Sequence, residues 1–121
     1  MTLVLVDTSV WVQHFRTSLA DLTSMVRRGE LVTHSVVIGE LAVGNMRQRT
    51  QTLADLRALT RLTEASPEYT LDLIERQALF GLGLSWGDVQ LLAACEAHKL
   101  QLWTLDRRLH VAAQAMSFAF P

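Results

Sequence analysis

The run from Leu3 to Trp11, LVLVDTSVW, is the feature that most constrains the fold of this chain. Four consecutive apolar residues lead directly into Asp7, and Thr8 and Ser9 follow it. A short apolar run of this kind is typical of a strand buried on both faces, as in parallel sheets covered by helices. We therefore expect Asp7 at the carboxyl end of a strand and at the start of a helix, either as a helix cap or as a ligand.

Strand and helix patterns alternate along the rest of the chain. We expect further strands near 30–34, 62–65, 101–105 and 117–120, and helices near 8–15, 18–28, 35–45, 47–60, 67–80, 85–99 and after 106. This alternation predicts an α/β, three-layer fold, with a small, mainly parallel sheet of about four to five strands flanked by helices. A length of 121 residues predicts one domain, 1–121.

Two helix starts have clear local signals. Ser35 is the expected N-cap of the helix that carries Glu40, and Ser66 with Pro67 opens the helix near 67–80. In that second helix, we expect the apolar residues Leu71, Ile74, Ala78 and Leu79 to face inward, with the GLG run at 81–83 ending it.

Composition excludes several classes of protein. The formal charge of −1 gives no overall attraction to nucleic acid, although a local basic patch remains open. Half of the residues are hydrophobic, which for so short a chain predicts that some apolar surface meets a partner. The lone Cys95 is expected to be a buried hydrophobic residue. No signal peptide or membrane span is expected, so we predict a cytoplasmic protein.

Four acidic residues are expected at one edge of the sheet. Asp7 and Asp106 follow strands directly. Asp88 opens a helix of roughly 17 Å that returns antiparallel to the strand near 101–105, which places it near Asp106. Glu40 lies about 8 Å along a helix that starts where another strand ends. Because all four acids are expected near the carboxyl ends of the strands, we predict that they lie close together.

Each acid also has a purely structural explanation. Asp7 and Asp106 suit helix N-caps, and Asp88 suits a capping box with Ser85. Glu40 lies in an apolar stripe without a basic partner, and a buried, unpaired carboxylate is costly. A divalent cation would neutralise such a cluster, and the all-oxygen donor set favours Mg²⁺ or Mn²⁺ over zinc.

The residues resemble a known family at this point. VDTSVW at 6–11, Glu40 with Gly44 after it, LSWGDVQLLAAC around Asp88 and WTLDRRL around Asp106 are similar to the motifs of PIN domains of the VapC toxin type. The resemblance spans nearly the whole chain. It implies a PIN-like fold in which Asp7, Glu40, Asp88 and Asp106 form the catalytic and metal-binding site.

The resemblance also implies an activity and partners. Thr8, Ser9 and Thr104 are expected to position metal or carboxylate. The expected reaction is Mg²⁺- or Mn²⁺-dependent hydrolysis of RNA, acting as the toxin of a VapBC-type toxin–antitoxin module and leaving 3′-hydroxyl and 5′-phosphate ends. A cognate VapB-type antitoxin and a homodimer are the expected protein partners, with Trp11, Val12 and Phe15 as part of the antitoxin surface.

RNA contacts are predicted from residue type and position. Arg47, Arg49, Arg107 and Arg108 are the basic residues nearest to Glu40 and Asp106 in the sequence, although a solvated helix surface explains them equally well. Trp86 is the best candidate for stacking on a base. Trp11 and Trp103 are expected in the core or at an interface.

Other functions fit less well. A metal-free ribonuclease using histidine as acid and base is one alternative, but of the four histidines only His34 lies near the expected edge. A haloacid dehalogenase-type phosphatase needs DxD, and position 9 is Ser. A receiver domain needs Lys at a later strand end, and Lys99 precedes its strand. A catalytically inactive PIN-fold module that binds RNA or protein stays open.

Overall fold

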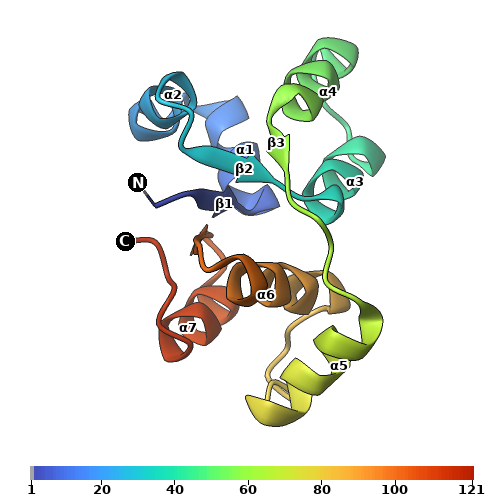
Figure 1. Ribbon diagram of the computed structural model, residues 1–121. Helices are drawn as coiled ribbons and strands as arrows, with labels where there is room; N and C mark the ends of the chain where they lie inside the picture. The colour runs from blue at the N-terminus through green and yellow to red at the C-terminus, as the bar shows by residue number, and fades with distance from the viewer. Residues whose placement is uncertain (1) are drawn as a thin grey trace.

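The computed structural model describes residues 2–121 and shows a sheet between two layers of helices (Figure 1). The strands are β1 (Val4–Val6), β2 (Leu31–Thr33), β3 (Thr60–Arg61) and β4 (Gln101–Trp103). The helices are α1 (Thr8–Arg16), α2 (Ala20–Arg27), α3 (Ser35–Val43), α4 (Arg49–Ala58), α5 (Pro67–Arg76), α6 (Trp86–His98) and α7 (Arg107–Ala115). The predicted three-layer α/β architecture is confirmed.

The strands pair in the order β3-β2-β1-β4, and every pair is parallel. The chain moves from β1 to β2 and β3, and then crosses back to place β4 on the other side of β1. Helices α1 to α4 therefore cover one face and α5 to α7 the other (Figure 1). The reversal makes the carboxyl end of β1 a topological switch point, the place where such sheets bind ligands.

The core lies around β1 and α6. All three residues of β1 are buried, and Leu5 pairs with Val32 on one side and Leu102 on the other. Helix α6 is buried on most sides because it lies between the sheet and α5, and its buried residues are Val89, Leu91, Leu92, Ala93, Ala94 and Cys95. An apolar helix of this kind cannot sit on the surface. The prediction that Cys95 is buried is confirmed, and burial raises the pKa of its thiol.

Several predicted details of the sheet and of α5 are wrong. Helix α5 ends at Arg76, so Ala78, Leu79 and the GLG run expected to end it all lie beyond it. The strand expected near 62–65 forms two residues earlier as β3, whose exposed residues carry no apolar signal because β3 is an edge strand. The segment near 117–120 makes only an isolated parallel bridge between Ala119 and Leu102. Leu71 of α5 is 54% exposed, whereas Leu73 is fully buried in its place.

The start of α3 also differs from the prediction. His34 is the N-cap, and its Nδ1 accepts a hydrogen bond from the Val36 N–H at 3.0 Å. Ser35 is the first helical residue and donates its hydroxyl to Glu64. Imidazole is an uncommon cap, so sequence preferences favoured the neighbouring serine.

None of the helices within residues 2–121 combines the length and the apolar character needed to cross a lipid bilayer.

Replacing Leu92 by alanine tests whether α6 organises the core. Leu92 has no exposed surface, so the substitution should lower the free energy of unfolding by about 2 to 5 kcal/mol, measured by urea denaturation. Leu71→Ala is the matched control, because it makes the same change on the exposed face of α5 and should cost less than about 0.5 kcal/mol. Equal losses in the two variants would contradict this description of the core.

Candidate active site

Asp7 is fixed at the carboxyl end of β1 by two hydroxyl groups. Its Oδ2 accepts hydrogen bonds from Ser9 Oγ at 2.7 Å and from Thr104 Oγ1 at 2.8 Å. The same oxygen caps α1 by accepting from the Ser9 N–H at 3.4 Å. Only 6% of Asp7 is exposed, so these donors replace the water that its charge would otherwise lose.

The two hydroxyls also join β1 to the loop after β4. Ser9 Oγ accepts from the Leu105 N–H at 2.9 Å, and Thr104 Oγ1 accepts from the Asp106 N–H at 3.0 Å. The Asp7 N–H in turn donates to the Trp103 carbonyl at 2.9 Å. The switch point of the sheet is thus held together by hydrogen bonds that converge on Asp7.

Glu40 lies beside the same edge but is not buried. It is exposed on α3, and its Oε1 accepts from Thr8 Oγ1 at 2.7 Å. The expectation of a buried, unpaired carboxylate was wrong, because Val43 on that stripe is itself 89% exposed. Glu40 Oε2 lies 3.8 Å from the point where a side chain at Gly87 would begin, which places Glu40 against the start of α6.

Asp88 and Asp106 complete the group of acids. Asp88 forms a capping box with Ser85, whose N–H donates to Asp88 Oδ2 at 3.0 Å. Asp106 caps α7 through its Oδ1, which accepts from the Leu109 N–H at 3.1 Å. The caps predicted for Asp7, Asp88 and Asp106 are therefore present, and capping by one carboxylate oxygen does not exclude a second role for the other.

The electrostatic environment links three of these acids. Burial raises the pKa of Asp88, and the charges of Asp7 and Asp106 raise it further. A hydrogen bond from the Ser85 backbone opposes this shift. Like charges therefore meet at this edge with no basic side chain among the causes of the shift.

The donor set suits a hard cation, but no cage is preformed. Within the described residues, each acid uses one oxygen in the bonds above and leaves the other without a hydrogen bond. Carboxylate oxygens are the ligands that Mg²⁺ and Mn²⁺ prefer. However, no three Asp, Glu, His or Cys side chains of residues 2–121 lie close enough together to hold an ion as they stand. Binding would require these side chains to come closer together.

The remaining predicted site residues are distributed around this edge. Trp86, the first residue of α6, is 45% exposed, and Arg107 is exposed at the start of α7. The Arg108 guanidinium packs over Gly83. Arg49 donates to the Ala42 carbonyl at 2.6 Å and so joins α4 to α3.

His34 does not offer a general acid or base to solvent. Its ring is fully buried, and Nδ1 accepts the hydrogen bond that caps α3. Burial lowers the pKa of this imidazole, which favours the neutral form that the cap requires. This arrangement weighs against the metal-free mechanism based on histidine.

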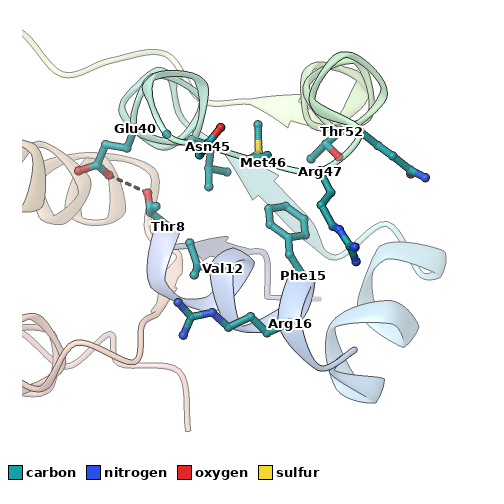
Figure 2. A pocket seen from close by; sticks show the side chains of 12 residues that line it. Thr8, Val12, Phe15, Arg16, Glu40, Asn45, Met46, Arg47 and Thr52 are labelled. Carbon is teal, nitrogen blue, oxygen red and sulfur yellow. Dashed lines mark hydrogen bonds between the residues drawn. The ribbon is translucent and has the colours of Figure 1, made fainter.

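A groove of about 840 Å³ opens beside Glu40 and Thr8, between α1 and the α3–α4 connection (Figure 2). Arg47, one of the predicted RNA contacts, lines it. Phe15 and Arg16 also line it, and neither was expected to contact RNA. Arg16 belongs to no motif, and it reaches the groove only through the packing of α3 and α4 alongside α1.

Comparison with known proteins places the chain. The family model described as PIN domain matches residues 4–115. Ribonuclease VapC32 of Mycobacterium tuberculosis is 37% identical over 111 residues, which cover 91% of this chain and 90% of that protein.

Solved structures share the fold. PAE2754 from Pyrobaculum aerophilum has a TM-score of 0.67 at 17% identity, covering 98% of this chain and 88% of its own. Mycobacterium tuberculosis VapC20, a Sarcin-Ricin loop cleaving toxin, has a TM-score of 0.66 at 17% identity, with 96% of each chain covered. The family model and the level of identity to VapC32 establish that this chain belongs to the PIN domain family.

Proposed function

We propose that this protein is a metal-dependent endoribonuclease that acts as the toxin of a VapBC-type toxin–antitoxin module. The observation that carries the proposal is the set of four acids around the switch point, each with one oxygen free of hydrogen bonds among the described residues. The 37% identity to a protein named a ribonuclease supports the same reaction.

The acidic residues would bind the metal ion, and the hydroxyl residues orient the acids. Asp7, Glu40, Asp88 and Asp106 would hold Mg²⁺ or Mn²⁺ through their free oxygens. When bound, such an ion supplies an acidified water and offsets charge on the phosphoryl oxygens. Ser9 and Thr104 keep the Asp7 carboxylate at the strand end, and Thr8 directs Glu40 toward the same edge.

Cleavage by hydrolysis determines the ends of the products. Because water and not the ribose 2′-hydroxyl attacks the phosphorus, the proposed products carry 5′-phosphate and 3′-hydroxyl ends. A histidine-based mechanism through the 2′-hydroxyl would instead leave a cyclic phosphate and would not need a metal.

Protein partners follow from the same proposal. A cognate VapB-type antitoxin would cover the helices around the acids, and a homodimer is usual in the family. The exposure of large apolar side chains supports contacts of this kind, since Val43, Phe80 and Leu105 are 89%, 64% and 55% exposed.

Replacing Asp7 by asparagine should abolish cleavage without unfolding the protein. The amide oxygen can still accept from Ser9 and Thr104, whereas the charge that would bind metal is lost. Loss of residues that merely orient metal ligands costs 10- to 100-fold, so we expect a loss of more than about 100-fold in RNA cleavage with Mg²⁺ or Mn²⁺.

The control and the contrary results are equally specific. Asp21→Asn makes the same change at an exposed position of α2 and should leave cleavage unchanged. Induced expression of the wild type, but not of Asp7→Asn, should arrest growth. Full activity in EDTA, or a cyclic phosphate at the new 3′ ends, would refute the mechanism.

Metal should stabilise the wild-type protein, and Asp88→Asn should reduce that effect. Because the pKa of Asp88 is raised in the folded state, ionisation of this residue opposes folding at neutral pH. Asp88→Asn should therefore raise the melting temperature in EDTA at pH 7. This gain should shrink as the pH falls through the raised pKa and disappear below the ordinary pKa of aspartate, where the wild type is also neutral.

Divalent metal that binds only the folded protein should raise the free energy of unfolding of the wild type by about 2.7 kcal/mol at a metal concentration 100 times the Kd, and the melting temperature should rise with it. The measurement is thermal unfolding with and without Mg²⁺. An equal shift in Asp88→Asn would show that Asp88 takes no part in binding the ion.

A further inference from the structure

The groove beside Glu40 has a charge pattern that suits a polyanion. Among the residues lining it, Glu40 is the single acid, whereas Arg16 and Arg47 are both basic. None of the three ion pairs within residues 2–121 involves either arginine, so neither guanidinium is already neutralised by a carboxylate. A volume of about 840 Å³ is within the roughly 300 to 1,000 Å³ of sites that enclose small ligands.

The two arginines reach the groove from different elements. Arg16 is the last residue of α1, and Arg47 lies in the connection between α3 and α4. Figure 2 shows the Arg47 side chain extending toward α1 beside the ring of Phe15, while Arg16 extends along α1 below Val12. Two guanidinium groups placed in this way can each contact a phosphate of an extended strand.

Phe15 supplies a preset aromatic surface between them. Its ring is 43% exposed, although it lies at a centroid distance of 6.2 Å and an angle of 29° from the buried Trp11. A ring held by a neighbour loses little freedom when a base stacks on it. Aromatic rings next to a basic groove are the usual platform for single-stranded nucleic acid.

We propose that this groove binds the single-stranded RNA substrate next to the acids, with Arg16 and Arg47 on phosphates and Phe15 stacked on a base. The inference rests on the proposed function and adds the path of the strand to it. The groove is continuous with the acids because Glu40, one of the four, lines it together with its hydrogen-bond donor Thr8. A strand in it would therefore present its next phosphodiester to the free carboxylate oxygens.

The proposed path of the RNA strand can be tested by measuring RNA binding to a variant that does not cleave RNA. In an Asp7→Asn background, a short fluorescein-labelled single-stranded RNA of mixed sequence is titrated by fluorescence anisotropy over a range of KCl concentrations. The double variant Arg16→Ala/Arg47→Ala should bind about tenfold more weakly or worse. The slope of log affinity against log salt should also fall by about 1.4, since each lost phosphate contact removes about 0.7.

The matched control removes the same charge elsewhere. Arg57→Ala/Arg61→Ala changes two exposed arginines that do not line the groove, and it should leave affinity and slope within twofold of the background protein. Phe15→Leu keeps an apolar side chain but removes the ring, and it should weaken binding by roughly tenfold at every salt concentration. Circular dichroism on each variant reports folding.

The possible results distinguish a failure of the groove proposal from a failure of the proposed ribonuclease function. Equal affinities in the groove and control variants, or no RNA binding at all, would overturn the groove proposal. A changed sedimentation coefficient in Arg16→Ala/Arg47→Ala with unchanged RNA affinity would assign the groove to a protein contact instead. The proposed function is judged separately, by cleavage of the same RNA by the wild type with Mg²⁺ or Mn²⁺.

Discussion

The hydrogen bonds from Ser9 and Thr104 to one oxygen of Asp7 hold together the edge of the sheet around which the four acids lie. They link the first strand to the last strand of the sheet, which are 95 or more residues apart in the chain but adjacent in space. The carboxylate is nearly inaccessible to water, so its charge depends on these donors. With that oxygen engaged, the other oxygen of Asp7 has no hydrogen bond among the described residues.

The four acids share one arrangement, in which one carboxylate oxygen is hydrogen-bonded and the other is not, within the part of the chain that the structure describes. Each carboxylate uses one oxygen in a hydrogen bond. Asp7, Asp88 and Asp106 accept from groups close in the sequence, as helix caps or a capping box, and Glu40 accepts from Thr8 on another helix. Burial raises the pKa of Asp88, and the charges of Asp7 and Asp106 raise it further. The local bonds offset part of the repulsion, and a cation would offset the rest. One oxygen of each acid is therefore hydrogen-bonded, whereas the negative charge of the group is not neutralised by any basic side chain of residues 2–121.

The groove extends this edge on the face covered by α1 to α4. Its walls come from α1 and from the segment between α3 and α4, and Arg49 stabilises the latter by bonding to the Ala42 carbonyl. Phe15, which the family resemblance assigned to the antitoxin surface, lines this groove. The groove contains Glu40 and the two arginines Arg16 and Arg47, so RNA bound there as proposed would run from the arginines toward the acids.

The sequence by itself determined the strand-to-helix order, the four acids and their local caps, because each is written in neighbouring residues: apolar runs, Ser-x-x-Asp spacing and acids directly after strands. It failed where the decision depended on distant contacts. The edge position of β3 removed its apolar signal, and the cap of α3 moved to His34.

Burial was likewise decided by the tertiary structure. Glu40 looked buried from its apolar neighbours, but nothing packs over Val43 on that stripe, and the carboxylate is exposed. Arg16 and Phe15 became groove residues only because α3 and α4 pack beside α1. Local sequence encodes backbone conformation and capping through short-range hydrogen bonds, whereas exposure and the assembly of side chains from separate helices depend on how those helices pack.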